Sequence, residues 1–315
     1  MGEPTEIHAP GADRAERSAR DGSDPGTDHT AHKPGGATRV AQPPAAGLRA
    51  RLREQRRIPR RPHLLFELAL IGISYWLYSL VRNAVPEQAA IAHKHANWIW
   101  DLEHTLGIAV ERSINHAVNS VTWLIVGMNY YYATLHFIVT IGVLVWLYRS
   151  HPGRYAAART VLFVTTGIAL LGFYFFPLAP PRLMDAGFVD TVTVHQTWGS
   201  MASGAGAHVS NQFAAMPSMH IGWSMWCGLT IFFLARRTWV RVLGLAYPLV
   251  TLSVIISTAN HFWLDAVGGE ICLIIGFVAA RFIYHNWVYR LPRDPDDPAE
   301  NALTVPVSWE TKVSA

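Results

Sequence analysis

The residues of this sequence best suited to chemistry are a histidine and an aspartate four positions apart, His261 and Asp265. On a helix this spacing places both side chains on one face, one above the other. A carboxylate on one imidazole nitrogen fixes the tautomer and leaves the other nitrogen free to attack an electrophile. The spacing alone is weak evidence, because a chain with 15 histidines is expected to contain it about once by chance. The alternative is an ordinary helix start in which Asp265 only stabilises the first turn.

Two other segments carry side chains that suit a phosphate site. Three closely spaced prolines before Arg182 prevent a helix from continuing and present its planar guanidinium, which matches phosphate oxygens. Pro217 suits the first position of a helix, so Ser218 and His220 are predicted in its first turn. A helix start has unpaired N–H groups and the positive end of the helix dipole, and both favour a bound anion.

The composition indicates that a membrane protein positions these segments. Half of the 315 residues are hydrophobic and only 15% are charged, against about 25% in average globular chains. The formal charge of +4 is mostly arginine beside the apolar runs, so nucleic acid is a poor explanation for it. Cys227 and Cys272 lie inside apolar runs, which argues against a disulfide framework.

Six apolar runs are each close to the roughly 20 residues that a helix needs to cross the hydrocarbon core. They predict an all-α integral membrane bundle of six transmembrane helices over 63–81, 121–148, 157–176, 217–235, 242–257 and 262–283. The mixed segment 83–120 predicts one or two amphipathic helices at the membrane surface. The catalytic domain is expected at 63–285, after a disordered region 1–62 that ends in a basic anchor and before a tail at 286–315.

The arginines between the runs predict an orientation. With the N-terminus inside, the inner loops 149–159 and 236–241 and the segment after Arg281 are all basic, as the positive-inside rule requires. Both termini are then cytoplasmic. Three segments then meet at the extracytoplasmic face: the first carries Arg182, the second Ser218 and His220, and the third His261 and Asp265. A phosphate ester bound there would meet two imidazoles, one to attack phosphorus and one to protonate the leaving oxygen.

Several other polar residues lie in or near the predicted bundle. His136, within the second run, is expected to face the bundle interior, either lining the active-site cavity or making a structural hydrogen bond. Glu270 is expected to bond within the bundle. His93, His95 and His104 are expected to be solvated, and no cluster has evident metal-ligand spacing, so no metal or other cofactor is predicted.

The stretches Pro217–His220 and His261–Asp265 resemble the second and third motifs of the phosphatidic acid phosphatase type 2 superfamily. The fuller stretches 177–182, 215–220 and 260–265 look most like the branch that contains inositol phosphorylceramide synthase. The resemblance implies a metal-independent enzyme with six transmembrane helices. It also implies a role for each matching residue: His261 as the phosphorylated nucleophile, Asp265 as its support, His220 as general acid, Ser218 and Arg182 as phosphate contacts, and Asn260 as a possible cavity residue.

The sequence departs from the superfamily's pattern at two cations. Seven residues before Arg182, where the usual first motif has lysine, the chain has Phe175. Six residues before His261, where the usual third motif has arginine, it has Ile255. Either the missing charge comes from elsewhere, or the substrate carries less negative charge, as a phosphodiester does. The second option favours headgroup transfer over hydrolysis of a monoester.

The sequence therefore predicts a membrane enzyme that cleaves or transfers the phosphate or phosphoryl headgroup of a lipid or polyprenyl phosphate through a phosphohistidine. A hydroxyl acceptor would make it a phosphotransferase of the inositol phosphorylceramide synthase type, and water would make it a lipid phosphate monoester phosphatase. The alternative of another class is a non-enzymatic transporter or anionic-headgroup-binding protein. Binding alone would not need a His-Asp pair beside a second histidine.

Overall fold

The computed structural model describes residues 59–60, 62–84, 89–197 and 212–297 of the chain. The chain divides into two compact units, 1–45 and 46–315, and all of the described residues belong to the second. The predicted disordered region 1–62 therefore lies almost entirely outside the described residues, as does the C-terminal tail beyond residue 297.

The regular secondary structure of the described part is helical, with no strand and only an isolated bridge between Leu178 and Ala214. This confirms the predicted all-α class. The α-helices are α2 (Leu64–Ala84), α3 (Ala89–Leu106), α4 (Glu111–Asn119), α5 (Thr122–Tyr130), α6 (His136–Ser150), α7 (Pro152–Phe175), α8 (Thr191–Val194), α9 (Met219–Leu234), α10 (Thr238–Ser257) and α11 (Trp263–Tyr284). A π-helical turn, η1 (Tyr131–Leu135), joins α5 to α6, and two short 3₁₀ helices are η2 (Pro181–Leu183) and η4 (Val288–Arg290).

Each of the six predicted apolar runs corresponds to helix. Four helical stretches of the described part are long and apolar enough to cross a membrane, and they are Thr122–Ser150, Pro152–Phe175, Thr238–Ser257 and Trp263–Tyr284. Leu64–Ser74 and Met219–Leu234 are shorter apolar helices. Large apolar side chains on these helices are exposed, among them Leu249 at 64% and Phe282 at 73%. A surface of this kind is stable against lipid rather than water, so the chain is a membrane protein.

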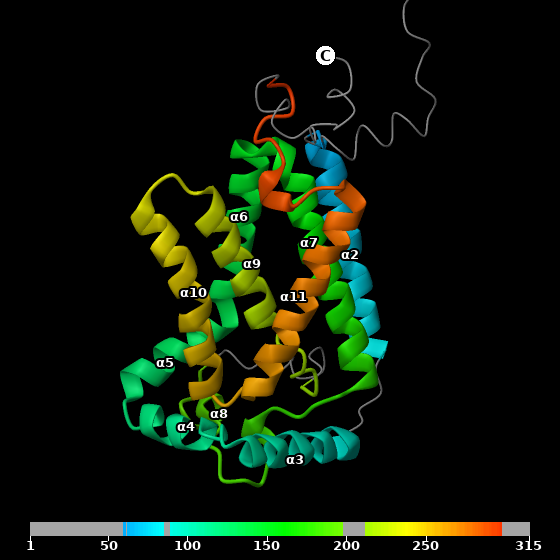
Figure 1. Cartoon of the computed structure of the whole chain (residues 1–315). Helices are drawn as coiled ribbons and strands as arrows, with labels where there is room; N and C mark the ends of the chain where they lie inside the picture. Colours follow the sequence, from blue (N-terminus) through cyan, green and yellow to red (C-terminus); the bar gives the residue numbers. More distant parts are fainter. Residues whose placement is uncertain (1–58, 61, 85–88, 198–211, 298–315) are drawn as a thin grey trace, which may run out of the picture. The chain divides into compact units, whose positions relative to one another are not determined.

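The core of the bundle lies where α9 meets its neighbours. Helix α9 packs against α6, α10 and α11, and α11 also packs against α7 (Figure 1). Trp226 of α9 is fully buried, and its indole N–H donates a 3.0 Å hydrogen bond to the carbonyl oxygen of Ala158 in α7. Val288 and Leu291, in the first part of the predicted tail, are buried in the same hydrophobic cluster.

The mixed segment between the first two runs forms two helices, α3 and α4. In Figure 1, α3 runs across the direction of the bundle helices rather than along them. Its buried residues are Ala92, Ala96, Ile99 and Glu103, a spacing of four, three and four that marks one face of a helix. This face packs on the loops that carry Leu178, Ala179, Ala215 and Phe262. Helix α3 therefore packs against all three of the segments that carry the predicted site residues.

Candidate active site

The loop after α7 is tied to both of the other chemical segments by backbone hydrogen bonds. Leu178 donates to the carbonyl oxygen of Phe213 at 2.8 Å and accepts from the N–H of Ala215 at 3.3 Å. Further along the loop, the N–H of Arg182 donates to the carbonyl oxygen of Ala259 at 2.9 Å. Because proline cannot extend α7 past Phe176, the chain is free to make these bonds. Three segments far apart in sequence thus lie together.

The second and third segments contact each other directly. The N–H of Ser218, the N-cap residue of α9, donates to the carbonyl oxygen of Asp265 in α11 at 2.9 Å. Gly269 permits this approach, since a Cβ at that position would lie far inside contact distance of the Ser218 carbonyl oxygen. Helix α9 begins at Met219, so the prediction that Pro217 takes the first helical position is wrong. Ser218 is the N-cap residue, without a side-chain cap hydrogen bond, and only His220 lies in the first turn.

His261 and Asp265 meet, although not on one helix as expected. Helix α11 begins at Trp263, and His261 precedes its N-cap residue, Phe262. Asp265 Oδ2 accepts the backbone N–H of Phe262 at 3.0 Å and lies 3.2 Å from His261 Nδ1. A carboxylate can only accept, so Nδ1 carries the proton. The side chain that caps the helix is thus the one that orients the imidazole.

The other ring nitrogen of His261, Nε2, makes no hydrogen bond to any described residue. His261 is buried, with an exposed fraction of 4%. The ring of His220 lies nearby, with 5.5 Å between the two ring centroids. A buried imidazole with an oriented tautomer and an open nitrogen has the geometry of a nucleophile.

Tyr132 and His136, in and just after a π-helical turn of the second predicted span, both contact the ring of His220. Tyr132, within this turn, stacks on the His220 ring at 4.2 Å, and its carbonyl oxygen lies 3.3 Å from His220 Nε2. His136, just after the turn, lies 4.3 Å from His220 between ring centroids. Its Nδ1 is buried without a partner among the described residues. Single π-helical turns occur often at functional sites, and this one places His136 beside His220. His136 and Asn260 were predicted as possible cavity residues, but neither lines the apolar cavity described below.

Arg182 reaches the site through Asn260. Its Nε donates to Asn260 Oδ1 at 3.1 Å, and Nη1 donates to Asp190 Oδ2 at 3.3 Å. Asn260 Nδ2 in turn donates to Thr258 Oγ1 at 2.9 Å, which stiffens the turn before His261. The ion pair with Asp190 is mostly buried and offsets much of the positive charge of Arg182.

The remaining predicted phosphate contact, Ser218, has a fully buried hydroxyl with no partner among the described residues. The two expected cations are not replaced nearby. Phe175 is 74% exposed on α7, and Ile255 is fully buried in an apolar cluster. In the described part of the chain, Arg182 is the only cationic side chain with a hydrogen bond to residues 260–265.

Two buried carboxyl groups beneath the site were missed by sequence reasoning, which treated Glu103 and Glu111 as part of a surface segment. Both are fully buried. Glu103 Oε1 accepts the N–H of Leu264 at 2.9 Å, and Glu111 Oε1 accepts the N–H of Trp263 at 3.3 Å. A signal was present, because Glu103 continues the apolar stripe of α3. Asn115 was also missed; it bonds to Ser257 and Val189.

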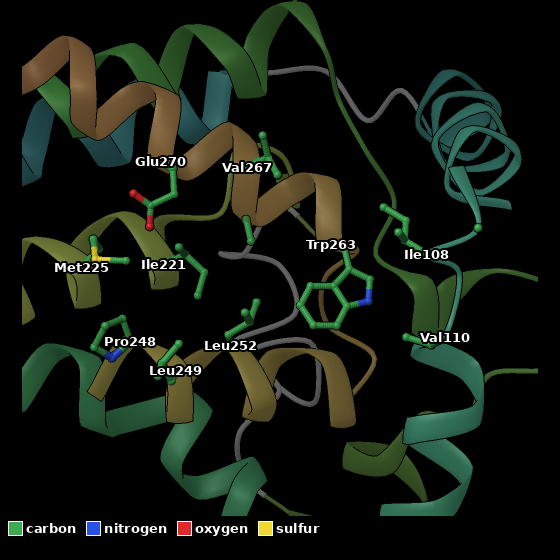
Figure 2. A pocket seen from close by; sticks show the side chains of 12 residues that line it. Ile108, Val110, Ile221, Met225, Pro248, Leu249, Leu252, Trp263, Val267 and Glu270 are labelled. Atoms are coloured by element: carbon green, nitrogen blue, oxygen red, sulfur yellow. The ribbon is translucent and has the colours of Figure 1, made fainter. Parts of the chain in front are cut away.

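An apolar cavity of about 610 Å³ opens beside the site, between α9, α10, α11 and the α3–α4 loop (Figure 2). Its wall includes Ile221 and Trp263, which are close in sequence to His220 and His261. Every lining residue is apolar except Glu270, whose carboxyl group Figure 2 shows at one end of the cavity. Glu270 makes no hydrogen bond to another described residue, so the expected bond within the bundle is not seen.

Comparison with models of protein families identifies the superfamily to which this chain belongs. The family model of the PAP2 superfamily matches residues 97–279, which is more than half of the chain, and the chain belongs to this superfamily. The match covers all of the chemical residues described above. It confirms the resemblance at the level of the superfamily and supports an activity of the lipid phosphatase or phosphotransferase type in general. Searches of curated proteins and of solved structures found no match.

Proposed function

We propose that this protein is a membrane enzyme that cleaves or transfers the phosphate or phosphoryl headgroup of a lipid-linked substrate through a phosphohistidine at His261. One observation carries the proposal. His261 has Asp265 on Nδ1 and an open, buried Nε2, and a second imidazole, His220, lies 5.5 Å away. A nucleophile, its orienting carboxylate and an acid within reach are the parts that covalent phosphoryl transfer needs.

The proposed reaction has two steps. In the first, His261 Nε2 attacks phosphorus, a P–N bond forms, the bond to the leaving oxygen breaks, and His220 gives that oxygen a proton. In the second, water or a hydroxyl group loses its proton to His220 and attacks phosphorus, so that the P–N bond breaks and His261 is regenerated. Asp265 holds the Nδ1 proton of His261 throughout and stabilises the positive charge on the ring.

Arg182 and Ser218 are proposed to hold the phosphate oxygens, with Asn260 orienting the Arg182 guanidinium and His136 packing beside His220. The charge at this site favours one substrate type. Arg182 is paired with Asp190, and no second cation hydrogen-bonds residues 260–265 within the described part of the chain. A phosphodiester carries one negative charge at phosphorus, whereas a monoester carries nearly two. A phosphotransferase of the inositol phosphorylceramide synthase type is therefore favoured over a lipid phosphate monoester phosphatase.

The apolar cavity supports a lipid or polyprenyl phosphate as substrate. Its wall includes Ile221, next to His220 in sequence, and Trp263, two residues after His261. A hydrocarbon chain inside it is proposed to place its phosphate at these two histidines. Leu249 and Val267 line the cavity and are also half exposed on the membrane-facing surface, which gives the chain a lateral route from the bilayer.

The topology is proposed to comprise six spans with both termini in the cytoplasm and the site at the extracytoplasmic face. The basic loops support it. A reporter fused after Ile283 should then remain inside the cell. A reporter found outside would overturn this orientation.

The most decisive test of the activity uses purified full-length protein in detergent with chelator present. It would be given lipid phosphate monoesters and phosphodiesters, each with and without a hydroxyl acceptor. Transfer to the acceptor supports the phosphotransferase, and release of phosphate supports the phosphatase. If neither product forms while lipid phosphates still bind, the non-enzymatic alternative is correct. Parent-level turnover in His261→Ala would refute the nucleophile.

A further inference from the structure

Two carboxyl groups from different helices accept hydrogen bonds from backbone N–H groups at the start of α11. Glu103 of α3 accepts the N–H of Leu264, and Glu111 of α4 accepts the N–H of Trp263. These are two of the N–H groups that a helix start leaves unpaired. They lie between His261 and Asp265 in sequence, so any shift of these bonds moves the proposed nucleophile and its orienting carboxylate together.

The two carboxyl groups accept from successive backbone N–H groups, those of Trp263 and Leu264, so they lie side by side. Each has a second buried oxygen, Oε2, with no hydrogen-bond partner among the described residues. Two ionised carboxylates can only accept hydrogen bonds, so a bond between them needs a proton. Without that proton, two like charges would lie buried in contact, which is unfavourable.

We propose that Glu103 and Glu111 share one proton and act together as a positioning pair that fixes His261 and Asp265 from behind. The pair does not touch substrate. It keeps a single negative charge at the start of α11, where the helix dipole favours an anion, and it uses the second carboxyl group as a neutral hydrogen-bond donor. The catalytic part of this inference rests on the proposed function, whereas the shared proton does not.

The charges around the pair agree with a shared proton. Burial, and then the adjoining carboxyl group of Glu111, raise the pKa of Glu103 to about 9, so one proton stays bound at neutral pH. From α4 the charge of Glu111 acts on Glu103, and from α11 that of Asp265 does, both in the direction that raises the pKa. No cation of the described residues acts on Glu103. The backbone N–H of Leu264 opposes the shift but does not outweigh it.

Glutamine substitutions separate a shared proton from a simple need for charge. A single glutamine accepts the backbone N–H through its oxygen and donates to the remaining carboxylate through its NH₂ group, as the protonated carboxyl does. Glu103→Gln and Glu111→Gln should therefore each keep kcat within about threefold of the parent, and the double variant, with two NH₂ groups facing each other, should lose at least about tenfold. Glu103→Ala should lose at least about tenfold in kcat with little change in KM.

A stability measurement tests the proton without any need for turnover. Native Glu103 keeps its proton until about pH 9, while an unfolded glutamate releases it near about pH 4.3. The native state thus holds the extra proton between these values, so stability falls as pH rises through this window. The thermal midpoint should drop between pH 6 and pH 9, and it should drop less in Glu103→Gln. Asp101→Asn, an exposed carboxylate on the same helix, is the matched control and should behave as the parent does.

The outcomes are distinct. If Glu103→Gln is as impaired as Glu103→Ala, or if its midpoint follows pH as the parent does, the shared proton is wrong. If Glu103→Ala retains parent kcat, the positioning role is wrong. If the parent has no activity on any lipid phosphate but the midpoints behave as expected, the proposed function fails while the proton pair stands.

Discussion

The backbone N–H of Ser218 donates a 2.9 Å hydrogen bond to the carbonyl oxygen of Asp265. This bond joins the start of α9 to the start of α11, and therefore the histidine in the first turn of α9 to the His-Asp pair at α11. Together with the bonds from the N–H of Ala215 to Leu178 and from the N–H of Arg182 to Ala259, it closes a ring of three segments. The distance between the two imidazoles depends on this ring.

Gly269 should be essential to that contact. A Cβ at this position would collide with the Ser218 carbonyl oxygen, which belongs to the backbone and cannot rotate away. Gly269→Ala should separate α9 from α11 and lower kcat by at least about tenfold, because small misplacements of reacting groups are costly. Gly142→Ala on α6 is the control, since a Cβ there meets nothing within 4 Å. Equal activity of both variants would show that the contact does not position the histidines.

His220 should matter in proportion to how poor the leaving group is. A general acid contributes roughly 100-fold or more when an alkoxide would otherwise leave, and little when the leaving oxygen is already stable as an anion. His220→Ala should therefore lose about 100-fold on a lipid phosphate but less than about tenfold on a nitrophenyl phosphate ester. His261→Ala should be inactive on both, which serves as the comparison. The same loss on both substrates in His220→Ala would exclude the acid role.

Asp190 should set the preference between phosphodiester and monoester. Its carboxylate pairs with Arg182 at 3.3 Å and also accepts from Thr193 at the start of α8. Asp190→Asn keeps an acceptor for Thr193 and frees the guanidinium charge. The ratio of kcat/KM for a monoester to that for the matching diester should rise by about fivefold. An unchanged ratio would mean that Arg182 does not contact the phosphate.

The apolar cavity should select for chain length. Leu249 lines it, and a tryptophan at this position would fill space that a hydrocarbon chain needs. Leu249→Trp should raise KM about fivefold or more for a long-chain substrate, the equivalent of losing contact with one or two CH₂ groups. A short-chain analogue should be unaffected. Leu243→Trp, exposed on the same helix but outside the cavity, is the control and should change neither value.

The sequence by itself determined the class of the protein and indicated most residues of the candidate site. Six apolar runs and their lengths follow from the thickness of a bilayer, and each run is helical here. The segments around Arg182, His220 and His261 could also be found from residue type and spacing, because each combines a helix-breaking or helix-starting signal with a side chain rare in apolar surroundings.

Only the tertiary structure decided how those residues meet. The pairing of His261 with Asp265 was expected on one helix face, but Asp265 caps α11 and reaches back to a residue before it. The buried roles of Glu103 and Glu111 depend on α3 and α4 packing against the start of α11. Hydrophobic periodicity reports which face of a helix is buried, but it does not report what that face will touch. Contacts between segments more than 100 residues apart are set by packing, and so the site was assembled by the fold.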